Sequence, residues 1–516
     1  MFLAAELGRK VKKKKFDALE PDLHTQLLTA QREARAKRVP LVVLVSGVEG
    51  AGKGEVVNRL HRWFDTRWVR THAFWDENDM ERERPRFWRF WQKLPPAGTT
   101  AVLFGSWYTR PIVDRAFRRV GQARFEQELR RIAEFERLLS DDGALIVKFW
   151  FHLSKEEQQK RLRDDVKQGR ITSPLLKKYA RRYDDFLAVS ERAIRLTDVG
   201  ACPWHIVDAH DRRYRDLTVG RTLLSALRAR LAAEPAAAPS AEAEASGDAA
   251  ATADVAPART NDASAVETPA STLAEGAAAR TVLDTVDLEA VLAPERYRKE
   301  LRRHQRRLNE LAWRAHTAGR HTIALFEGWD AAGKGGAIRR ITQAVDARLY
   351  QVISVAAPTE EERAQHYLWR FWRHLPRAGA MTFYDRSWYG RVLVERVERF
   401  AHETDWRRAY HEINDFEEQL VDHGVVLLKF WLHISPEEQL RRFEERERTA
   451  WKKHKITQED WRNREKWDAY RAAVDEMVAR THTNFAPWSL IGANDARHAR
   501  VEVLRTVCDR LDAALS

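Results

Sequence analysis

The sequence is poor in cysteine and has no long apolar run. Cys202 and Cys508 are its two cysteines in 516 residues, too few for a disulfide framework, so a reducing cytoplasm is the expected location. No apolar stretch approaches the ~20 residues of a membrane span. A few apolar residues (2–7) precede the basic run Lys12–Lys15, the reverse of the order in a signal peptide. We therefore expect no membrane partner.

Residues 232–280 lack Phe, Tyr, Trp, Ile and Lys and are dominated by Ala. Such a segment cannot bury enough apolar surface to offset its chain entropy. We expect a disordered, Ala/Pro-rich linker over 232–285, between an N-terminal domain (1–231) and a C-terminal domain (286–516). The whole length also exceeds what one core usually supports.

The chain carries an excess of positive charge. Its formal net charge of +13 favours a polyanionic partner such as nucleic acid, a membrane surface or a phosphate polymer. Charge alone does not distinguish these partners.

A glycine-rich loop, FEGWDAAGKGG, follows the apolar run 322–326 and precedes a segment with helical spacing. Strand, loop and helix in this order cradle a phosphate, because backbone N–H groups and the helix dipole face the anion. Lys334 adds a mobile positive charge. Most such loops carry Ser or Thr after the lysine to hold magnesium; here Gly335 follows, so Asp330 is the candidate ligand. The other expected phosphate-binding residues of the loop are Gly328, Ala331, Ala332, Gly333 and Gly335.

The chain contains a second copy of this loop after the run LVVLVS. Its glycine and lysine positions are Gly47, Gly52, Lys53 and Gly54. The offset of 281 between Lys53 and Lys334 also pairs Trp91 with Trp372 and extends through long stretches of both halves. The chain is therefore an internal repeat of two domains.

Each half alternates apolar runs with amphipathic segments. In the second half we expect strands at 322–326, 350–355, 380–384, 425–432 and 488–491. We expect helices at 335–346, 360–374, 389–398, 405–421, 436–448 and 458–480. This alternation predicts two tandem three-layer α/β/α domains, each with a parallel sheet that binds ligands at its carboxyl edge.

An acidic residue ends the third of these strands. Asp385 fits the magnesium-holding role of such a residue in phosphate-loop proteins; the structural alternative is a helix N-cap. Arg386 and Arg391 lie nearby and can neutralise phosphoryl oxygens. The first half has Phe104-Gly105 at the position of Asp385-Arg386. We therefore expect the second half to be catalytic and the first to be a degenerate copy, still able to bind a phosphate or to pack as a pseudo-dimer partner.

The segment EQLRRFEERERTAWKKHK, which begins at Glu438, is strongly basic. It is either a solvated helix with ion pairs such as Glu438–Arg442 or a lid that closes over a transferring phosphate. The phosphate loop upstream favours the lid. In that interpretation Arg442 and Arg446 steady the developing charge, and Lys452 and Lys453 bind phosphate.

Two aromatic-rich segments, 87–91 and 367–372, are either nucleobase platforms or core helices. Core packing is the expected role of most of these rings, because Trp and Phe fill helix–sheet interfaces. The sequence does not indicate which ring, if any, stacks on a base.

Together, the motifs EGWDAAGKGG, YDRSWYGR, KFWLHIS and APW resemble the polyphosphate kinase type 2 family in its tandem two-domain form. The resemblance covers both halves and implies a thymidylate-kinase-like P-loop fold with a helical lid. It implies Mg²⁺-dependent phosphoryl transfer between inorganic polyphosphate and nucleotides, in the tandem form from polyphosphate to AMP, giving ADP. It places Asp330, Lys334, Asp385 and Arg386 on catalytic positions and the polyphosphate on the basic lid.

Two other functions stay open: an ATP-dependent nucleotide monophosphate kinase and a non-catalytic polyanion-binding protein. The residues leave open the direction of the reaction and the choice among AMP, GMP and ADP as acceptor. A homo-oligomer is compatible with a tandem repeat. No nucleic-acid partner is expected.

Overall fold

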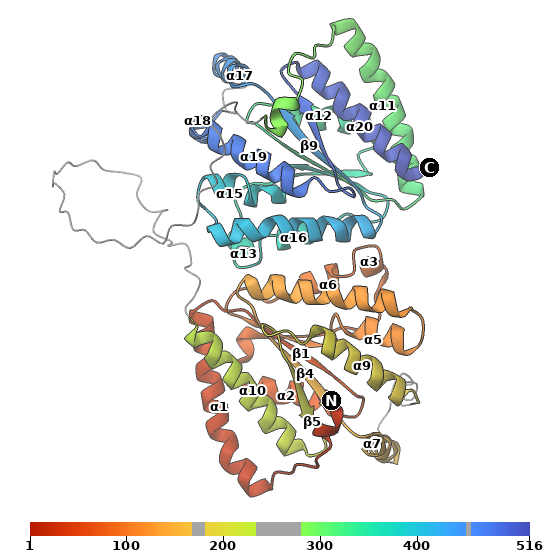
Figure 1. Cartoon of the computed structure of the whole chain (residues 1–516), viewed down its shortest axis with the longest axis vertical. Coiled ribbons are helices and arrows are strands. Elements are labelled where there is room, and N and C mark those ends of the chain that lie inside the picture. The colour runs from red at the N-terminus through yellow and green to blue at the C-terminus, as the bar shows by residue number, and fades with distance from the viewer. Residues whose placement is uncertain (168–180, 234–279, 450–455) are drawn as a thin grey trace, which may run out of the picture.

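The computed structural model describes residues 1–167, 181–233, 280–449 and 456–516. Two α/β units stack end to end, with α6 (Gln122–Asp141) of the first half facing α16 (Glu403–Asp422) of the second (Figure 1). Most of the predicted linker lies outside the described residues, so its N-terminal boundary stays a prediction. Within the described ranges, no helix is both long and apolar enough to cross a bilayer.

Each half contains a five-stranded parallel sheet, as predicted. The strand orders, β2-β3-β1-β4-β5 and β7-β8-β6-β9-β10, are the same in the two halves. The first-half strands are β1 (Leu41–Gly47), β2 (Val69–Ala73), β3 (Thr100–Phe104), β4 (Leu145–His152) and β5 (Trp204–Asp208). The second-half strands are β6 (Thr322–Gly328), β7 (Tyr350–Ser354), β8 (Met381–Asp385), β9 (Val426–His433) and β10 (Trp488–Gly492). All five second-half predictions hold to within two residues.

Helices cover both faces of each sheet (Figure 1). The remaining first-half helices are α1 (Lys13–Ala36), α2 (Lys53–Trp63), α3 (Asp79–Arg82), α4 (Trp88–Trp91), α5 (Thr109–Ala116), α7 (Lys155–Lys167), α9 (Tyr183–Thr197) and α10 (Arg212–Ala232). Those of the second half are α11 (Pro294–Thr317), α12 (Lys334–Thr342), α13 (Glu360–Arg363), α14 (Trp369–Trp372), α15 (Val394–Val397), α17 (Pro436–Arg448), α18 (Gln458–Glu465), α19 (Trp467–Thr481) and α20 (Ala496–Leu515). Short 3₁₀ turns are η1 (Phe2–Ala5), η2 (Thr66–Trp68), η4 (Val282–Thr285) and η5 (Trp388–Arg391).

Three expected helices are interrupted. The range 360–374 forms α13 and α14, 389–398 forms η5 and α15, and 458–480 forms α18 and α19. The last break falls at Lys466, whose ammonium pairs with Glu398 at 2.7 Å. Amphipathic spacing continues across such breaks, so periodicity alone does not reveal them.

The last residues of the predicted linker belong structurally to the second half. η4 packs against α19, its Leu283 is buried, and Asp284 forms an ion pair with Arg471 of α19. The linker was predicted from its low aromatic content, and this composition does not show at which residue packing against the second half begins.

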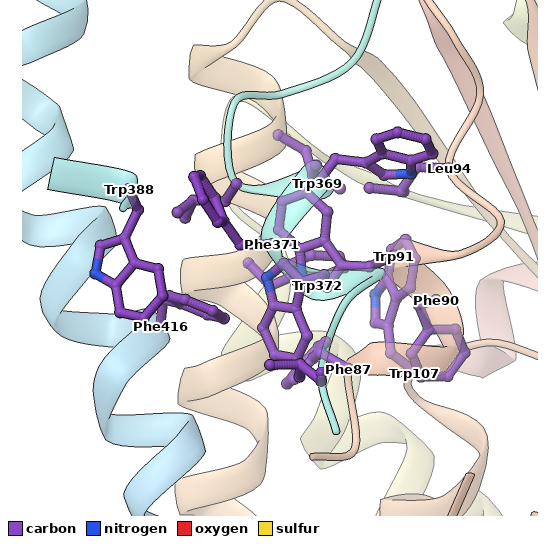
Figure 2. Packing of buried hydrophobic residues seen from close by; sticks show 14 of the residues in the cluster. Phe87, Phe90, Trp91, Leu94, Trp107, Trp369, Phe371, Trp372, Trp388 and Phe416 are labelled. Atoms are coloured by element: carbon purple, nitrogen blue, oxygen red, sulfur yellow. The ribbon is translucent and has the colours of Figure 1, made fainter. Parts of the chain in front are cut away.

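Aromatic rings from equivalent positions join the two halves. Trp91 and Trp372 stack with centroids 5.8 Å apart at an interplanar angle of 15° (Figure 2). The other buried rings of the two aromatic segments are Phe87, Phe90, Trp369 and Phe371. The expectation that most of these rings pack in the core is confirmed.

Hydrogen bonds at the interface repeat the same local symmetry. Arg84 Nε donates to the Leu375 carbonyl at 3.3 Å, and Gln365 Nε2 donates to the Leu94 carbonyl at 3.5 Å. The 281-residue offset relates Arg84 to Gln365 and Leu94 to Leu375. The halves therefore pair about an approximate twofold axis, like two subunits of a dimer.

The charges at this interface do not follow the symmetry. Arg131 of α6 forms an ion pair with Asp422 of α16, and Arg408 of α16 pairs with Asp142 at 3.2 Å. The repeat equivalent of Arg131 is Glu412. In a pairing of two second halves, Glu412 would face Asp422 and like charges would repel.

We predict that Arg131→Asp weakens the contact between the halves by about 1–2 kcal/mol, because two carboxylates then face each other. A protease site inserted between residues 234 and 279 allows the folded chain to be cut, and dilution on gel filtration measures dissociation of the halves. Adding Asp422→Arg to Arg131→Asp should restore the contact. Equal dissociation of wild type and Arg131→Asp would contradict the prediction.

Candidate active site

The glycine-rich loop joins β6 to α12. Lys334 begins the helix, and its Nζ donates to the carbonyl oxygens of Gly328 at 2.6 Å and Trp329 at 3.2 Å. Ala331 and Gly333 have φ values of 64° and 108°. Left-handed residues among right-handed ones give the backbone a concavity suited to an anion. The loop therefore has the form expected of a phosphate site.

Asp385 ends β8 beside the start of α12. A Cβ built on Gly335 would lie 3.7 Å from Asp385 Oδ2, so the carboxylate approaches the position that carries Ser or Thr in most phosphate loops. Within the described part of the chain, this carboxylate has no hydrogen-bond or ion-pair partner. The N-cap of the following helical turn is Ser387 and not Asp385, because the Ser387 side chain accepts a hydrogen bond from Tyr389 N. Asp385 is thus available to a ligand.

Arg386 reaches across to the loop from a strained backbone position. Its φ is 66°, and Gly105 holds φ 79° at the equivalent position. A left-handed non-glycine residue costs about 1–2 kcal/mol. Arg386 Nη2 donates to Asp330 Oδ1 at 3.2 Å. Burial alone would lower the pKa of Arg386, but the charges of Asp330 and Glu327 raise it.

Glu327 is a buried carboxylate that the sequence analysis did not single out. It accepts a hydrogen bond from Ser387 Oγ at 2.7 Å. Burial raises the pKa of Glu327, against the opposite effects of the Ser387 bond and the Arg386 charge. The first half has Ser46 at this position. The sequence feature that could have revealed Glu327 is the presence of an acidic residue in an otherwise apolar strand.

The helix α17, where the predicted lid begins, and the two helices that follow it contact the loop. Asn463 Nδ2 of α18 donates to Asp330 Oδ2 at 3.0 Å, and Gln439 Nε2 of α17 donates to Asp330 O at 3.2 Å. Trp467, at the start of α19, stacks on Trp329 with centroids 3.7 Å apart. Sequence reasoning missed Asn463 and Trp467 because their partners lie more than 130 residues away.

Arg442 lies on the expected helix, α17, and its hydrogen bonds are all made within the protein. All five of its N–H groups are committed, at distances between 2.5 and 3.1 Å. The acceptors are Glu438 Oε1 and the carbonyl oxygens of Ala331, Ala332, Ala493 and Asn494. No donor is left for a transferring phosphate, so we assign Arg442 the role of holding the loop.

The first half has an equivalent arginine with equivalent contacts. Arg161 donates to the carbonyl oxygens of Gly50 at 3.0 Å, Ala209 at 3.0 Å and His210 at 2.8 Å. Arg161 and Arg442 are related by the 281-residue offset. A residue retained in both halves in the same contacts supports a structural role for this arginine.

The other predicted phosphate ligands lie on α17, on η5 or outside the described residues. Arg446 lies one helical turn beyond Arg442 on α17 and is half-buried. Arg391 pairs with Glu395 at 3.0 Å. Lys452 and Lys453 lie outside the described residues. Their roles stay predictions.

The loop of the first half is engaged by protein groups. Lys53 Nζ donates to Gly47 O at 2.9 Å and pairs with Glu49 at 3.1 Å. A Cβ built on Gly52 would lie 1.8 Å from Arg215 Nη1, so the buried Arg215 guanidinium covers this side of the loop. In the second half, the nearest atom to the same point on Gly333 is 4.0 Å away.

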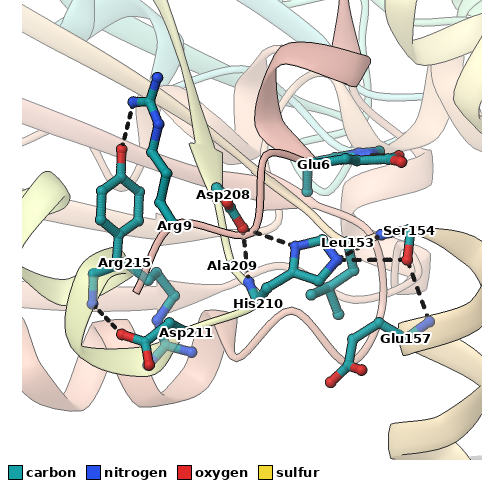
Figure 3. A network of polar contacts seen from close by, with 12 residues as sticks. Glu6, Arg9, Leu153, Ser154, Glu157, Asp208, Ala209, His210, Asp211 and Arg215 are labelled. Atoms are coloured by element: carbon teal, nitrogen blue, oxygen red, sulfur yellow. Dashed lines mark hydrogen bonds and ion pairs between the residues drawn. The ribbon is translucent and has the colours of Figure 1, made fainter. Parts of the chain in front are cut away.

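The loop after β5 is also fixed, as Figure 3 shows. His210 Nδ1 lies 2.8 Å from Asp208 Oδ1, and His210 Nε2 lies 3.4 Å from Ser154 Oγ. The first half packs against the second through the Trp91–Trp372 stack and the Arg131–Asp422 ion pair, as a pseudo-dimer partner would. Its capacity to bind a phosphate stays a prediction.

A buried ion pair holds the segment that follows Asp385-Arg386. Lys429 Nζ lies 2.7 Å from Glu417 Oε2, and both side chains have 0% exposure. Glu417 Oε1 accepts hydrogen bonds from Trp388 Nε1 at 3.0 Å and Tyr389 OH at 2.8 Å. The catalytic candidates are thus attached to a rigid part of the core.

The residues present fit a hard divalent cation. Asp385 has a carboxylate without a hydrogen-bond or ion-pair partner among the described residues, and Asp330 lies on the facing loop. In the described ranges, no group of three or more His, Cys, Asp or Glu residues could hold a metal. Mg²⁺ is commonly bound by one or two carboxylates plus substrate phosphates and water. The donor set therefore suits a metal that arrives with a phosphate ligand.

A parallel sheet, a phosphate loop and an acidic residue at the end of a neighbouring strand define a P-loop phosphoryl-transfer protein. The family model of polyphosphate kinase 2 (PPK2) matches residues 10–235 and 291–516. The chain belongs to the polyphosphate kinase 2 family, and it carries the family domain twice.

Relatives match the whole tandem arrangement. A polyphosphate:AMP phosphotransferase of Pseudomonas aeruginosa is 45% identical, covering 100% of this chain and 99% of the relative. One of Acinetobacter johnsonii is 36% identical over 94% of each chain. A crystal structure of a polyphosphate kinase 2 from Pseudomonas aeruginosa has a TM-score of 0.85 at 44% identity, covering 100% of this chain and 99% of that one.

Arg386→Gly separates backbone strain from side-chain chemistry. Because glycine adopts positive φ without a Cβ penalty, we expect unchanged stability or a gain of up to about 1 kcal/mol, measured by urea denaturation. Turnover should fall by about 10²–10³-fold as the positive charge is lost. Ala331→Gly is the matched control, since Gly50 holds φ 80° at the equivalent position, and it should stay active. Full activity of Arg386→Gly would show that turnover does not need the positive charge of Arg386.

Lys429→Met should cost about 3–5 kcal/mol of stability, because Glu417 stays buried without its counter-charge. Turnover of the remaining folded protein should also fall, since Trp388 and Tyr389 lose a fixed anchor. Lys148, which pairs with Glu136 at 2.7 Å in the first half, provides the control. Lys148→Met should destabilise similarly in calorimetry and keep its turnover. Equal loss of turnover in both variants would show that the anchor is not specific to the site.

Proposed function

We propose that this chain transfers a phosphoryl group from inorganic polyphosphate to AMP, forming ADP. The observation that carries the proposal is the meeting of Lys334, Asp385 and the Asp330–Arg386 pair at one edge of the second sheet. The chain also matches polyphosphate:AMP phosphotransferases along its whole length. The first half lacks the Asp-Arg pair, so we assign the chemistry to the second.

In this reaction, an oxygen of the AMP phosphate attacks the terminal phosphorus of the polyphosphate. The anhydride bond to the next phosphate breaks, and the shortened polyphosphate leaves with the electron pair. No general base is needed, because a phosphate monoester is largely ionised at neutral pH. Loop amides and Lys334 hold the transferring group, and Arg386 opposes the charge that develops on it. Arg442 acts by holding the loop.

We propose that Asp330 and Asp385 hold Mg²⁺, which when bound neutralises charge on the phosphoryl oxygens. Asp330 would have to exchange part of its contact with Arg386 and Asn463 for this role. Those two contacts also fix the direction of the carboxylate, as supporting hydrogen bonds do around metal ligands.

We also propose a cytoplasmic location, because Cys202 and Cys508 are both free and buried, which suits a reducing compartment. Association of whole chains into a homo-oligomer is a further proposal. The interface between the halves already satisfies one dimer-like surface, so any such contact would use another face.

Incubation of the purified chain with Mg²⁺, polyphosphate and AMP, without ATP, should yield ADP, measured by chromatography. Lys334→Ala should lower the rate by about 10²-fold or more, because a charge-assisted contact to the transferring group is lost. Lys53→Ala should stay close to wild type. GMP and ADP in separate reactions identify the preferred acceptor. Activity with ATP but not polyphosphate, or loss of turnover in Lys53→Ala alone, would contradict the proposal.

A further inference from the structure

An arginine of the C-terminal helix lies against the first turn of α12. Arg500 Nη2 would be 3.5 Å from a Cβ built on Gly336, and the side chain is half-buried. Within the described residues, Arg500 has no hydrogen-bond or ion-pair partner. The preceding residue, Gly335, faces Asp385. Two successive glycines therefore face an acidic and a basic side chain on different sides of the helix.

The dipole of α12 opposes a positive charge in the position of Arg500. The start of a helix carries a partial positive charge, so a cation there is repelled and an anion is attracted. A phosphate between the guanidinium and the helix amides would interact favourably with both. The protein itself supplies no carboxylate for Arg500 in the described part.

The first half has an acidic residue at the position equivalent to Arg500. The helices α10 and α20 begin after Asp211 and Asp495, which sets the late offset at 284 and makes Asp216 the equivalent of Arg500. Asp216 Oδ1 lies 2.8 Å from Arg215 Nη2, and Glu55, the equivalent of Gly336, lies 2.9 Å from the same nitrogen. An internal ion network thus replaces the basic residue in the degenerate half.

The reversal extends over a larger surface. In the first half a cavity of about 630 Å³ lies beside the loop, between α1, α2 and α10. The second half replaces three acidic positions of its lining, Asp17, Glu55 and Asp216, with Arg298, Gly336 and Arg500. Two basic positions of the lining, Lys13 and Arg212, become Pro294 and Ala496, so the surface beside the second loop gains three positive charges on balance. Such a surface suits a linear polyanion better than a single nucleotide phosphate.

We propose that Arg500 is a further phosphate-binding residue of this site, which holds the polyphosphate chain next to the transferring phosphate. The inference rests on the proposed function and names the residue that binds the donor polymer. In this assignment the polyphosphate donor lies on the side of α12 that faces Arg500, and Asp385 lies on a different side of the helix.

Steady-state kinetics of the full chain test the assignment. Arg500→Ala should raise the KM for polyphosphate by about tenfold, the effect of one lost charge-assisted contact. Its kcat and its KM for AMP should stay within twofold, and Arg500→Lys should recover part of the affinity. Arg510→Ala, an exposed site further along α20, should match wild type. Titration with polyphosphate at several salt concentrations should show a slope reduced by about 0.7 in Arg500→Ala.

An unchanged KM for polyphosphate in Arg500→Ala would overturn the proposal, and so would a change in the KM for AMP alone. If Arg500→Ala unfolds in circular dichroism, Arg500→Gln and Arg500→Lys carry the same comparison. Wild-type chain that neither binds polyphosphate nor forms ADP would overturn the proposed function instead. If the wild-type chain forms ADP and Arg500→Ala has the same KM for polyphosphate, only the inference about Arg500 is overturned.

Discussion

The fully buried Lys429–Glu417 pair is the constraint on which the second half depends. Two charges without solvent are tolerated only when each has well-placed partners. Lys429 meets Glu417, Tyr389 and the Thr481 carbonyl, and thereby joins β9, η5, α16 and α19. Because η5 follows Asp385-Arg386 directly, the same pair that stabilises the core also fixes the backbone that presents the catalytic candidates.

The repeat shows that scaffold and chemistry are separable. The first half keeps the buried pair as Lys148–Glu136 and keeps the loop-holding arginine as Arg161, yet it lacks the Asp-Arg sequence. Even the left-handed backbone persists there, where Gly105 adopts it at little cost. In the second half the same conformation is imposed on Arg386. Strain is thus confined to a position where a side chain is needed, as is common at functional sites.

Sequence patterns predicted the parts of the molecule that depend on local order. Alternating apolar runs indicated the strands, and glycine spacing indicated both loops, because turn geometry and sheet burial act over a few residues. Contacts between distant segments were not predictable in this way. The commitment of Arg442 to four carbonyl groups, the Asn463–Asp330 bond and the place of Arg500 all require knowing which segments meet. The arginine-rich helix was predicted to be a ligand surface, whereas Arg442 on that helix makes all its hydrogen bonds within the protein.

Retention of a half without the catalytic pair has a physical reason in the interface. Trp372 and its neighbours form an apolar surface that water would contact if the second half were alone. The equivalent Trp91 covers it by stacking, which two identical halves could also achieve. The unlike charges of Arg131 with Asp422 and of Arg408 with Asp142 go further, because they favour pairing of unlike halves. Once such differences are established, the second half is a poor partner for its own copy, because Glu412 would face Asp422. The first half then persists as a fixed subunit, whether or not its loop binds phosphate.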